Sequence, residues 1–150
     1  MTDNMNDAIR ELLDRNAIRD VLLRYARGVD RRDVDLVASC FLPGARYEGA
    51  LGQGTIETAL NALRERLARY EGTMHFIGNQ LIELHGDKAR SETYAVAYHR
   101  RCVAGAPQLL SVGLRYVDDL VRSDGQWRIH CRFVYREWQR REPLDESPWT

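Results

Sequence analysis

The chain has 150 residues, of which 44% are apolar and 29% charged, a composition typical of one globular domain with a single core. Its 22 basic and 22 acidic residues balance, so no net positive field favours a nucleic acid as partner. The apolar runs are too short to cross a bilayer, and the polar start lacks the apolar segment of a signal peptide. We therefore expect one domain over residues 1–150 that is cytoplasmic and binds neither nucleic acid nor membrane.

The cysteines support a reducing compartment. There are three of them, an odd number, at wide spacings and without a CxxC pair, namely Cys40, Cys102 and Cys131. Such usage predicts neither a disulfide framework nor a zinc cluster.

Helical periodicity dominates the first part of the chain. Apolar residues recur at three- and four-residue steps between Asn6 or Asp7, either of which could cap the start, and Gly28. The pattern predicts a long amphipathic helix. Its buried stripe is expected to hold Ile9, Leu12, Leu13, Ala17, Val21 and Leu22.

Two further helices are predicted before residue 72. Asp33 is the expected N-cap of a short helix that Pro43-Gly44 would stop. Residues 45–51 are predicted to form a short strand that carries Tyr47, and residues 52–55 a turn. The third helix follows that turn, and its apolar face holds Ile56, Leu60, Leu63 and Leu67.

The periodicity changes after Gly72. Segments rich in β-branched and aromatic residues follow, separated by hairpin turn signals, at 74–84, 88–103, 109–122 and 126–138. Helices followed by antiparallel strands predict an α+β fold, with three N-terminal helices packed on a strongly curved, mainly antiparallel sheet. Long curved strands closed by helices would form a cone-shaped barrel with an internal pocket. The core is expected over about 7–138, followed by a polar C-terminal tail at 139–150.

Motifs for phosphate binding, zinc proteolysis and α/β-hydrolase chemistry are absent from the sequence. Polar residues within apolar elements are what remains. Tyr25 and Asp30 lie near the end of the first helix but about 140° apart on ideal geometry, so they would converge only if the helix distorts near Gly28. His75 opens the first long strand, where a structural and a functional role are both open.

Two later strands carry further candidates. His99 follows the small residues Ser91, Thr93, Ala95 and Ala97 on one strand face, as in a pocket wall, although a half-exposed strand gives the same pattern. Simple alternation on the last strand turns Arg132 toward solvent, opposite an apolar face. If both faces of this strand are buried, the alternation does not decide where Arg132 points.

Four segments resemble the SnoaL-like branch of the nuclear transport factor 2 superfamily. They are the helix end at 23–33, TMHFIGN at 73–79, SVGLRY at 111–116 and GQWRI at 125–129. The resemblance spans about residues 7–138 and implies the same cone-shaped α+β fold. It does not fix the reaction, because this superfold hosts many chemistries.

The resemblance also implies site residues. Scytalone dehydratase, bile acid 7α-dehydratase and hexachlorocyclohexane dehydrochlorinase share a His–Asp dyad, which falls on His75 and Asp30. The tyrosine of the bile acid enzyme falls on Tyr25, an expected proton donor. The arginine of the bile acid enzyme and the dehydrochlorinase falls on Arg132, an expected electrophile. A bulge would have to turn Arg132 inward to face His75, beside Asp30 or another acceptor. The predicted substrate-binding residues are Tyr47 and His99.

This set predicts a lyase or isomerase that uses neither a cofactor nor a metal. It would perform a dehydratase-like elimination or a double-bond shift on a small, mostly apolar, ring-containing molecule of aromatic or steroid-like character. A polyketide cyclase is one alternative. Another is a non-catalytic module, either a small-molecule-binding protein or an oligomer-building subunit that resembles the β chain of ring-hydroxylating dioxygenases.

The last strand also bears on assembly. It carries more aromatic side chains than one wall can bury, namely Trp127, Phe133, Tyr135 and Trp138. We therefore expect a homodimer or homotrimer built through the outer face of the sheet.

Overall fold

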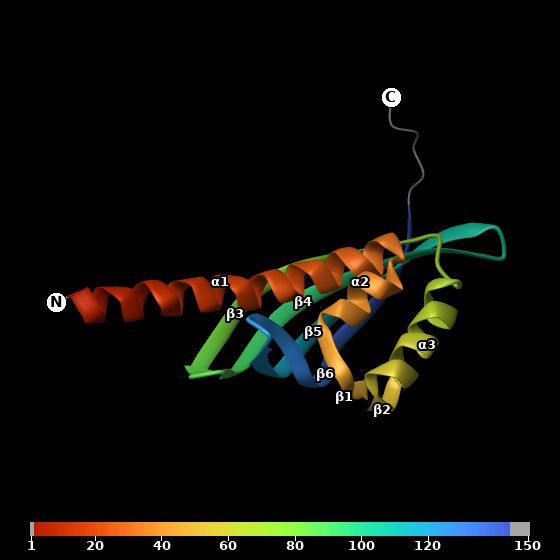
Figure 1. The fold of residues 1–150 in the computed structure, drawn as a ribbon. Coiled ribbons are helices and arrows are strands. Elements are labelled where there is room, and N and C mark those ends of the chain that lie inside the picture. The colour runs from red at the N-terminus through yellow and green to blue at the C-terminus, as the bar shows by residue number, and fades with distance from the viewer. Residues whose placement is uncertain (1, 145–150) are drawn as a thin grey trace.

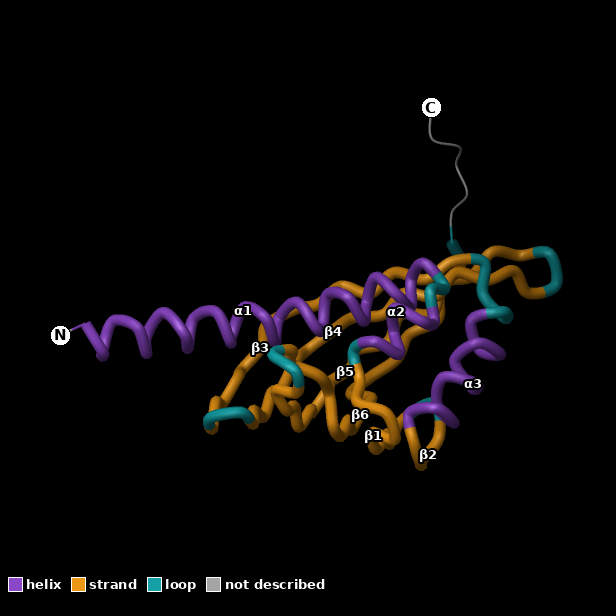
Figure 2. The backbone as a smooth tube through the Cα atoms, viewed as in Figure 1, coloured by secondary structure: helices purple, strands orange, loops and turns teal. Residues whose placement is uncertain are grey.

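Three helices and six strands make up the fold of the computed structural model, which describes residues 2–144, with side chains from residue 5. In chain order they are α1 (Thr2–Arg31), α2 (Val34–Ser39), β1 (Phe41–Gly49), β2 (Gly52–Thr55), α3 (Ile56–Leu67), β3 (Gly72–His85), β4 (Lys88–Val103), β5 (Ala106–Ser123) and β6 (Gln126–Pro143). The helices gather on one side of the curved sheet, with α1 lying along it and α3 beside β1 and β2 (Figures 1 and 2). The predicted α+β class is confirmed.

The sheet has the strand order β2-β1-β6-β5-β4-β3. Its neighbours run antiparallel except for β1 and β6, which are parallel. The four long strands follow one another through hairpins, as the turn signals predict. Asp124 and Gly125 both take positive φ angles, 52° and 74°, as the two central residues of a type I′ hairpin turn require.

Register shifts curl the long strands. One lies in β3 between Ile77 and Gln80, and two lie between β5 and β6, after Gly113 and after Asp119. Each inserts unpaired residues, and this bends the strand and increases its twist. Strands of 14 to 18 residues that bend in this way wrap around the helices and enclose the interior of the cone.

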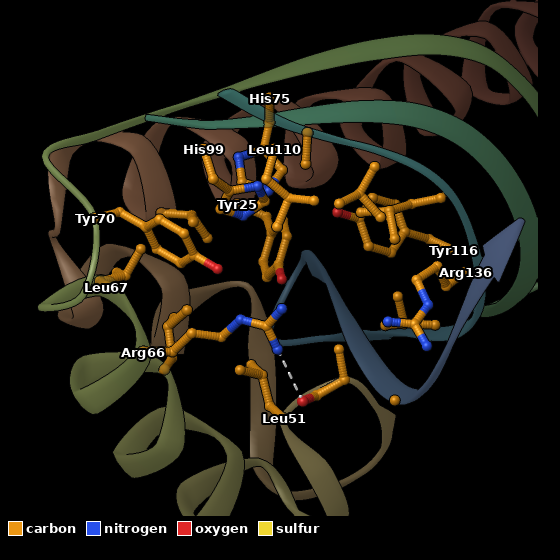
Figure 3. A pocket seen from close by; sticks show the side chains of 18 of the residues that line it. Tyr25, Leu51, Arg66, Leu67, Tyr70, His75, His99, Leu110, Tyr116 and Arg136 are labelled. Atoms are coloured by element: carbon orange, nitrogen blue, oxygen red, sulfur yellow. Dashed lines mark hydrogen bonds between the residues drawn. The ribbon is translucent and has the colours of Figure 1, made fainter. Parts of the chain in front are cut away.

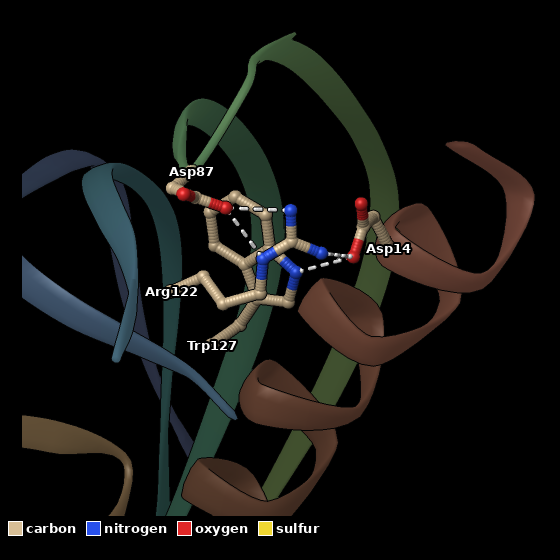
Figure 4. A network of polar contacts seen from close by, with 4 residues as sticks. All are labelled: Asp14, Asp87, Arg122 and Trp127. Atoms are coloured by element: carbon tan, nitrogen blue, oxygen red, sulfur yellow. Dashed lines mark hydrogen bonds and ion pairs between the residues drawn. The ribbon is translucent and has the colours of Figure 1, made fainter. Parts of the chain in front are cut away.

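A polar network fastens α1 to the narrow end of the cone (Figure 4). Asp14 accepts hydrogen bonds from Arg122 at 2.8 Å and from the Trp127 indole at 2.9 Å. The same guanidinium lies 2.6 Å from Asp87 in the β3–β4 turn and 5.4 Å from the centre of the Trp127 ring. Beyond this point α1 is buried on one face, through Ile18, Val21, Leu22, Tyr25 and Val29.

The N-terminal half of α1 departs from prediction. The helix begins at Thr2, ahead of the expected cap at Asn6 or Asp7. Ile9, Leu12 and Leu13 are 47%, 67% and 65% exposed, so this part of the predicted buried stripe is wrong. Figure 1 shows that the start of α1 projects beyond the sheet, which accounts for this exposure. No helix within residues 2–144 is long and apolar enough to cross a membrane.

Three predicted boundaries are also wrong. Pro43-Gly44 does not stop α2 but lies inside β1, where the pairing with β6 is irregular and no ladder donor is needed. Residues 52–55 form β2, not a turn. Residues 139–143 continue β6, because they pair with the equally long β5, so the predicted tail begins later. Residues 145–150 of that tail lie outside the described part of the chain.

Candidate active site

A cavity of about 470 Å³ lies inside the cone (Figure 3). Its wall is built by α1, α3 and all strands except β2, and much of it is apolar, so the predicted internal pocket is present. The polar side chains in the wall are Tyr25, Tyr47, Arg66, Tyr70, His75, His99, Tyr116, Arg136 and Gln139.

Asp30 and His75 form a hydrogen-bonded pair at this wall. The His75 Nδ1 atom lies 2.7 Å from Asp30 Oδ1, and the His75 amide donates to Oδ2 at 2.8 Å. Thr73 adds a third contact, because its hydroxyl donates to Oδ1 at 3.0 Å. Burial raises the pKa of Asp30, but the bonds from His75 and Thr73 outweigh burial and lower the pKa below its usual value. The carboxylate is therefore ionised at neutral pH.

This geometry determines the tautomer of a neutral His75 ring. An ionised carboxylate only accepts hydrogen bonds, so the proton of the neutral ring sits on Nδ1 and the lone pair on Nε2. Among the described residues, Nε2 has no hydrogen-bond partner. Since His75 belongs to the cavity wall, Nε2 is the nitrogen that can accept a proton from a ligand.

The helix reaches this arrangement without distortion. It continues past Gly28 to Arg31, so the distortion that would make Tyr25 and Asp30 converge does not occur. Tyr25 lines the cavity itself, whereas Asp30 lies behind His75 and acts on the cavity through that ring. Gly28 serves packing instead, because a Cβ there would lie 2.7 Å from a methyl group of Val37 on α2.

Tyr25 and Tyr47 are both buried in the wall. Burial raises the pKa of Tyr25, and the charge of Arg132 opposes this only in part. Burial likewise raises the pKa of Tyr47. Both hydroxyl groups therefore stay protonated and can donate hydrogen bonds to a ligand oxygen. Tyr47 thus lies where the prediction of substrate binding requires it, and binding itself stays a prediction.

His99 lies beside the pair. Its ring centre is 6.0 Å from that of His75 and 4.7 Å from that of Tyr70. Burial, together with the charges of His75 and Arg66, lowers the pKa of His99 to about 4, so the ring is neutral at neutral pH. The small residues that precede it do form a buried strand face, as expected, and Ala97 and His99 belong to the cavity wall.

A bulge turns Arg132 inward. Leu120 pairs with Ile129 and Asp119 with Cys131, so His130 is the extra residue and the alternation of β6 reverses after it. Arg132 is completely buried and donates to both carboxylate oxygens of Asp118, each at 2.7 Å. The prediction from simple alternation, that Arg132 faces solvent, is therefore wrong. The acceptor of its hydrogen bonds is Asp118, not Asp30.

The position expected for Arg132 needs correction. Its guanidinium is packed among aromatic rings, 4.2 Å from the centre of Tyr25 and 4.5 Å from that of Tyr116. Those two rings line the cavity and Arg132 does not, so its guanidinium lies behind them instead of facing His75 across the pocket, and its electrophile role stays a prediction. The neighbouring strand supplies a carboxylate that a buried arginine needs, and that pairing keeps the side chain behind the wall.

The sequence of this chain matches a known domain family. The family model described as "SnoaL-like domain" matches residues 10–132. The chain belongs to the SnoaL-like domain family. An uncharacterised protein of Mycobacterium tuberculosis is 30% identical over 138 residues, which cover 89% of this chain and 92% of that protein.

Solved structures share the SnoaL-like fold. A putative scytalone dehydratase from Novosphingobium aromaticivorans superposes with a TM-score of 0.76 at 21% identity, covering 93% of this chain and 91% of that chain. A hexachlorocyclohexane dehydrochlorinase from Novosphingobium barchaimii gives 0.78 at 20% identity, covering 95% and 98%. A Kribbella flavida protein gives 0.79 at 19% identity, covering 87% and 95%.

Several residues in the cavity wall or behind it are not predicted by the sequence of this SnoaL-like domain. Thr73 belongs to the TMHFIGN segment, but the segment does not predict the hydrogen bond from Thr73 to Asp30. Asp118 offered a signal, since it is a carboxylate within an apolar strand segment. Arg66, Tyr70 and Arg136 gave no signal of this kind, because charged and aromatic side chains at such positions are equally typical of exposed surface. In the described part of the chain, no three His, Cys, Asp or Glu side chains gather where they could hold a metal ion.

Proposed function

We propose that this SnoaL-like protein is a cofactor-free lyase or isomerase in which His75 is the base and Asp30 orients it. The observation that carries the proposal is the 2.7 Å contact between Asp30 and His75 Nδ1 at the wall of the cavity. The carboxylate holds the neutral tautomer and then stabilises the imidazolium formed when Nε2 takes a proton.

The proposed elimination balances with the residues at hand. His75 Nε2 takes a proton from a carbon next to a carbonyl group, and the released electron pair forms a carbon–carbon double bond. The leaving hydroxyl departs with its bonding pair and takes a proton from Tyr25 or, in a second step, from the imidazolium. In a double-bond shift the imidazolium returns the same proton to a more distant carbon. Neither route transfers electrons to a separate acceptor.

The wall supports a substrate of moderate size with an apolar, ring-containing body. Leu63, Leu67, Leu110, Val112 and Leu114 contribute apolar surface to a cavity of about 470 Å³. Aromatic and steroid-like molecules fit this description. A polyketide cyclase would use the same base on another substrate, while a non-catalytic module would bind such molecules without turnover.

The experiment uses a panel of cyclic β-hydroxy ketones and β,γ-unsaturated ketones. Elimination or isomerisation converts both to conjugated enones, whose ultraviolet absorbance is followed with wild-type protein and with His75→Ala. We expect turnover of at least one compound by the wild type and loss of about a hundredfold or more in the variant. Binding without turnover across the panel would favour the non-catalytic module, and equal rates in both proteins would remove His75 as the base.

We also propose that the protein forms a homodimer or homotrimer through the outer sheet face. Support comes from Tyr135 and Trp138 on β6 and Phe76 on β3, which are 47%, 50% and 66% exposed. Trp127 no longer contributes, because it is buried against α1. Light scattering at micromolar concentration should give two or three times the 17.4 kDa chain mass. A monomer mass under those conditions would contradict the proposal.

A further inference from the structure

The cavity wall carries an unbalanced charge. Arg66 from α3 and Arg136 from β6 both belong to it, and among the described residues no carboxylate does. The nearest acidic group of the proposed machinery, Asp30, is engaged behind His75. The chain as a whole has 22 acidic residues for 22 basic ones, so this local excess is not a consequence of composition.

Both arginines have only neutral acceptors within residues 5–144. Arg66 donates to the Ala50 carbonyl oxygen at 3.0 Å, and Arg136 donates to the Gln139 side chain at 3.2 Å. Arg115 differs from them, because it contacts two carboxylates, those of Glu92 and Glu137. Arg66 is half-buried and Arg136 is exposed, and a guanidinium with one neutral acceptor retains several donors for an oxyanion.

The arginines lie away from the dyad. Figure 3 shows His75 and His99 on one side of the pocket and Arg66 and Arg136 on the other, with Tyr25 between the histidines and Arg66 in this view. The charge of Arg66 acts within the cavity, because it adds to burial in lowering the pKa of His99. A ligand that spans the cavity would therefore present one end to the base and the other to the two guanidinium groups.

We propose that the ligand of this cavity carries an oxyanion, such as a carboxylate, sulfonate or phosphate, which Arg66 and Arg136 bind at the end opposite His75. The assignment of the reacting end rests on the proposed function, but the anion site stands on the arginines alone. Guanidinium groups bind planar or tetrahedral oxyanions through paired N–H donors, and the partly enclosed site strengthens the attraction.

A matched pair of fluorescent probes tests the anion site. The compounds 8-anilinonaphthalene-1-sulfonate and N-phenyl-1-naphthylamine share the same ring body and differ by the sulfonate group. Fluorescence titration of the full chain should give affinity about tenfold higher for the sulfonate. The difference should shrink as salt is added, because ions screen the attraction.

Variants locate the effect. Arg66→Gln should weaken sulfonate binding about tenfold, and Arg136→Gln about threefold because Arg136 is more exposed, with the neutral probe unchanged in both. Arg69→Gln is the matched control, since Arg69 is exposed near the same helix end and lies outside the wall. Ala97→Phe, or Leu51→Trp if the first melts early in circular dichroism, should block both probes by filling the cavity.

Three results would overturn the anion site. They are equal affinity for both probes, equal losses in Arg66→Gln and Arg69→Gln, or sulfonate binding that survives in both cavity-filling variants. Probe binding is measured on the wild type and the arginine variants without any turnover. If no ketone of the panel is turned over but sulfonate binding still depends on Arg66 and Arg136, the proposed reaction alone is rejected. If a ketone is turned over but sulfonate binding does not depend on the two arginines, the anion site alone is rejected.

Discussion

Two carboxylates in this molecule each hold a basic side chain at 2.7 Å, yet their surroundings differ. Asp30 and His75 meet at the cavity wall, to which His75 belongs while Asp30 lies behind it. Asp118 and Arg132 meet behind that wall and are both fully buried. Bond length therefore does not separate a candidate catalytic pair from a structural one. Access to the cavity does, because only His75 can present a ring nitrogen to a ligand.

The two pairs also differ in how their charges are balanced. Arg132 and Asp118 neutralise each other, with the rings of Tyr25 and Tyr116 stacked on the guanidinium. Asp30 is held by neutral donors from Thr73 and the His75 amide as well as by the imidazole. Removal of one member should consequently affect stability most in the first pair and activity most in the second.

The largest expected effect is on folding. Asp118→Ala leaves the Arg132 guanidinium buried without its counter-charge, which should lower the free energy of unfolding by about 3–5 kcal/mol. Urea denaturation measures the change. The double variant Asp118→Leu with Arg132→Met removes both charges and should recover much of the loss. A single variant as stable as the wild type would show that the pair is dispensable.

Asp30→Asn reverses the balance of effects. The amide cannot hold the same tautomer or stabilise the imidazolium, so turnover of an identified substrate should fall about a hundredfold or more. The free energy of unfolding should fall by only about 1–2 kcal/mol, since the amide keeps one oxygen acceptor but loses the charge that strengthens these hydrogen bonds. Asp119→Asn is the control, because Asp119 pairs with Arg90 on an exposed surface. Equal activity in the two variants would place Asp30 outside the mechanism.

Much of this contrast could be predicted from the sequence. The change of period after Gly72 predicts the order of helices and strands, and the TMHFIGN segment places His75 beside Asp30 by resemblance. The faces of α3 and of the strand leading to His99 follow from local alternation alone. These features depend on residues that are close in the sequence, and the hydrophobic pattern therefore predicts them.

Other features depend on residues distant in sequence. The inward turn of Arg132 needs the bulge at His130, and its acceptor Asp118 lies 14 positions away on the adjacent strand. The exposure of Leu12 depends on where the sheet ends beneath α1. The cavity positions of Arg66 and Arg136 depend on the register of α3 and β6 around the cone. Local periodicity contains none of this information.

Tyr25 connects the two pairs, because it lines the cavity on one side and covers Arg132 on the other. Tyr25→Phe keeps the ring and removes the hydroxyl. We expect turnover to fall about tenfold or more through loss of the proton donor. The melting temperature should stay close to that of the wild type, since the ring contact with Arg132 remains. A variant that melts early but turns over normally would assign Tyr25 to the structural pair.

The last expected effect concerns the pH dependence of stability on the cavity side. The pKa of His99 is about 4 in the folded protein against 6.5 for an ordinary histidine. Between these values the unfolded chain binds more protons at this residue than the folded chain does. The contribution of His99 to the free energy of unfolding is therefore level above about pH 6.5 and decreases as the pH falls toward 4.

His99→Gln tests this because glutamine keeps a polar side chain without a titrating group. Chemical denaturation of both proteins at pH 7 and pH 5 gives the difference in the free energy of unfolding at each pH. Wild type minus variant should be larger at pH 7, because only the wild type loses the His99 contribution on acidification. Titration of Asp30 does not interfere, since its lowered pKa places its own loss below pH 3.8. An unchanged difference between the two pH values would mean that the cavity wall does not hold His99 neutral, and the ring would then be protonated beside His75 in mildly acidic solution.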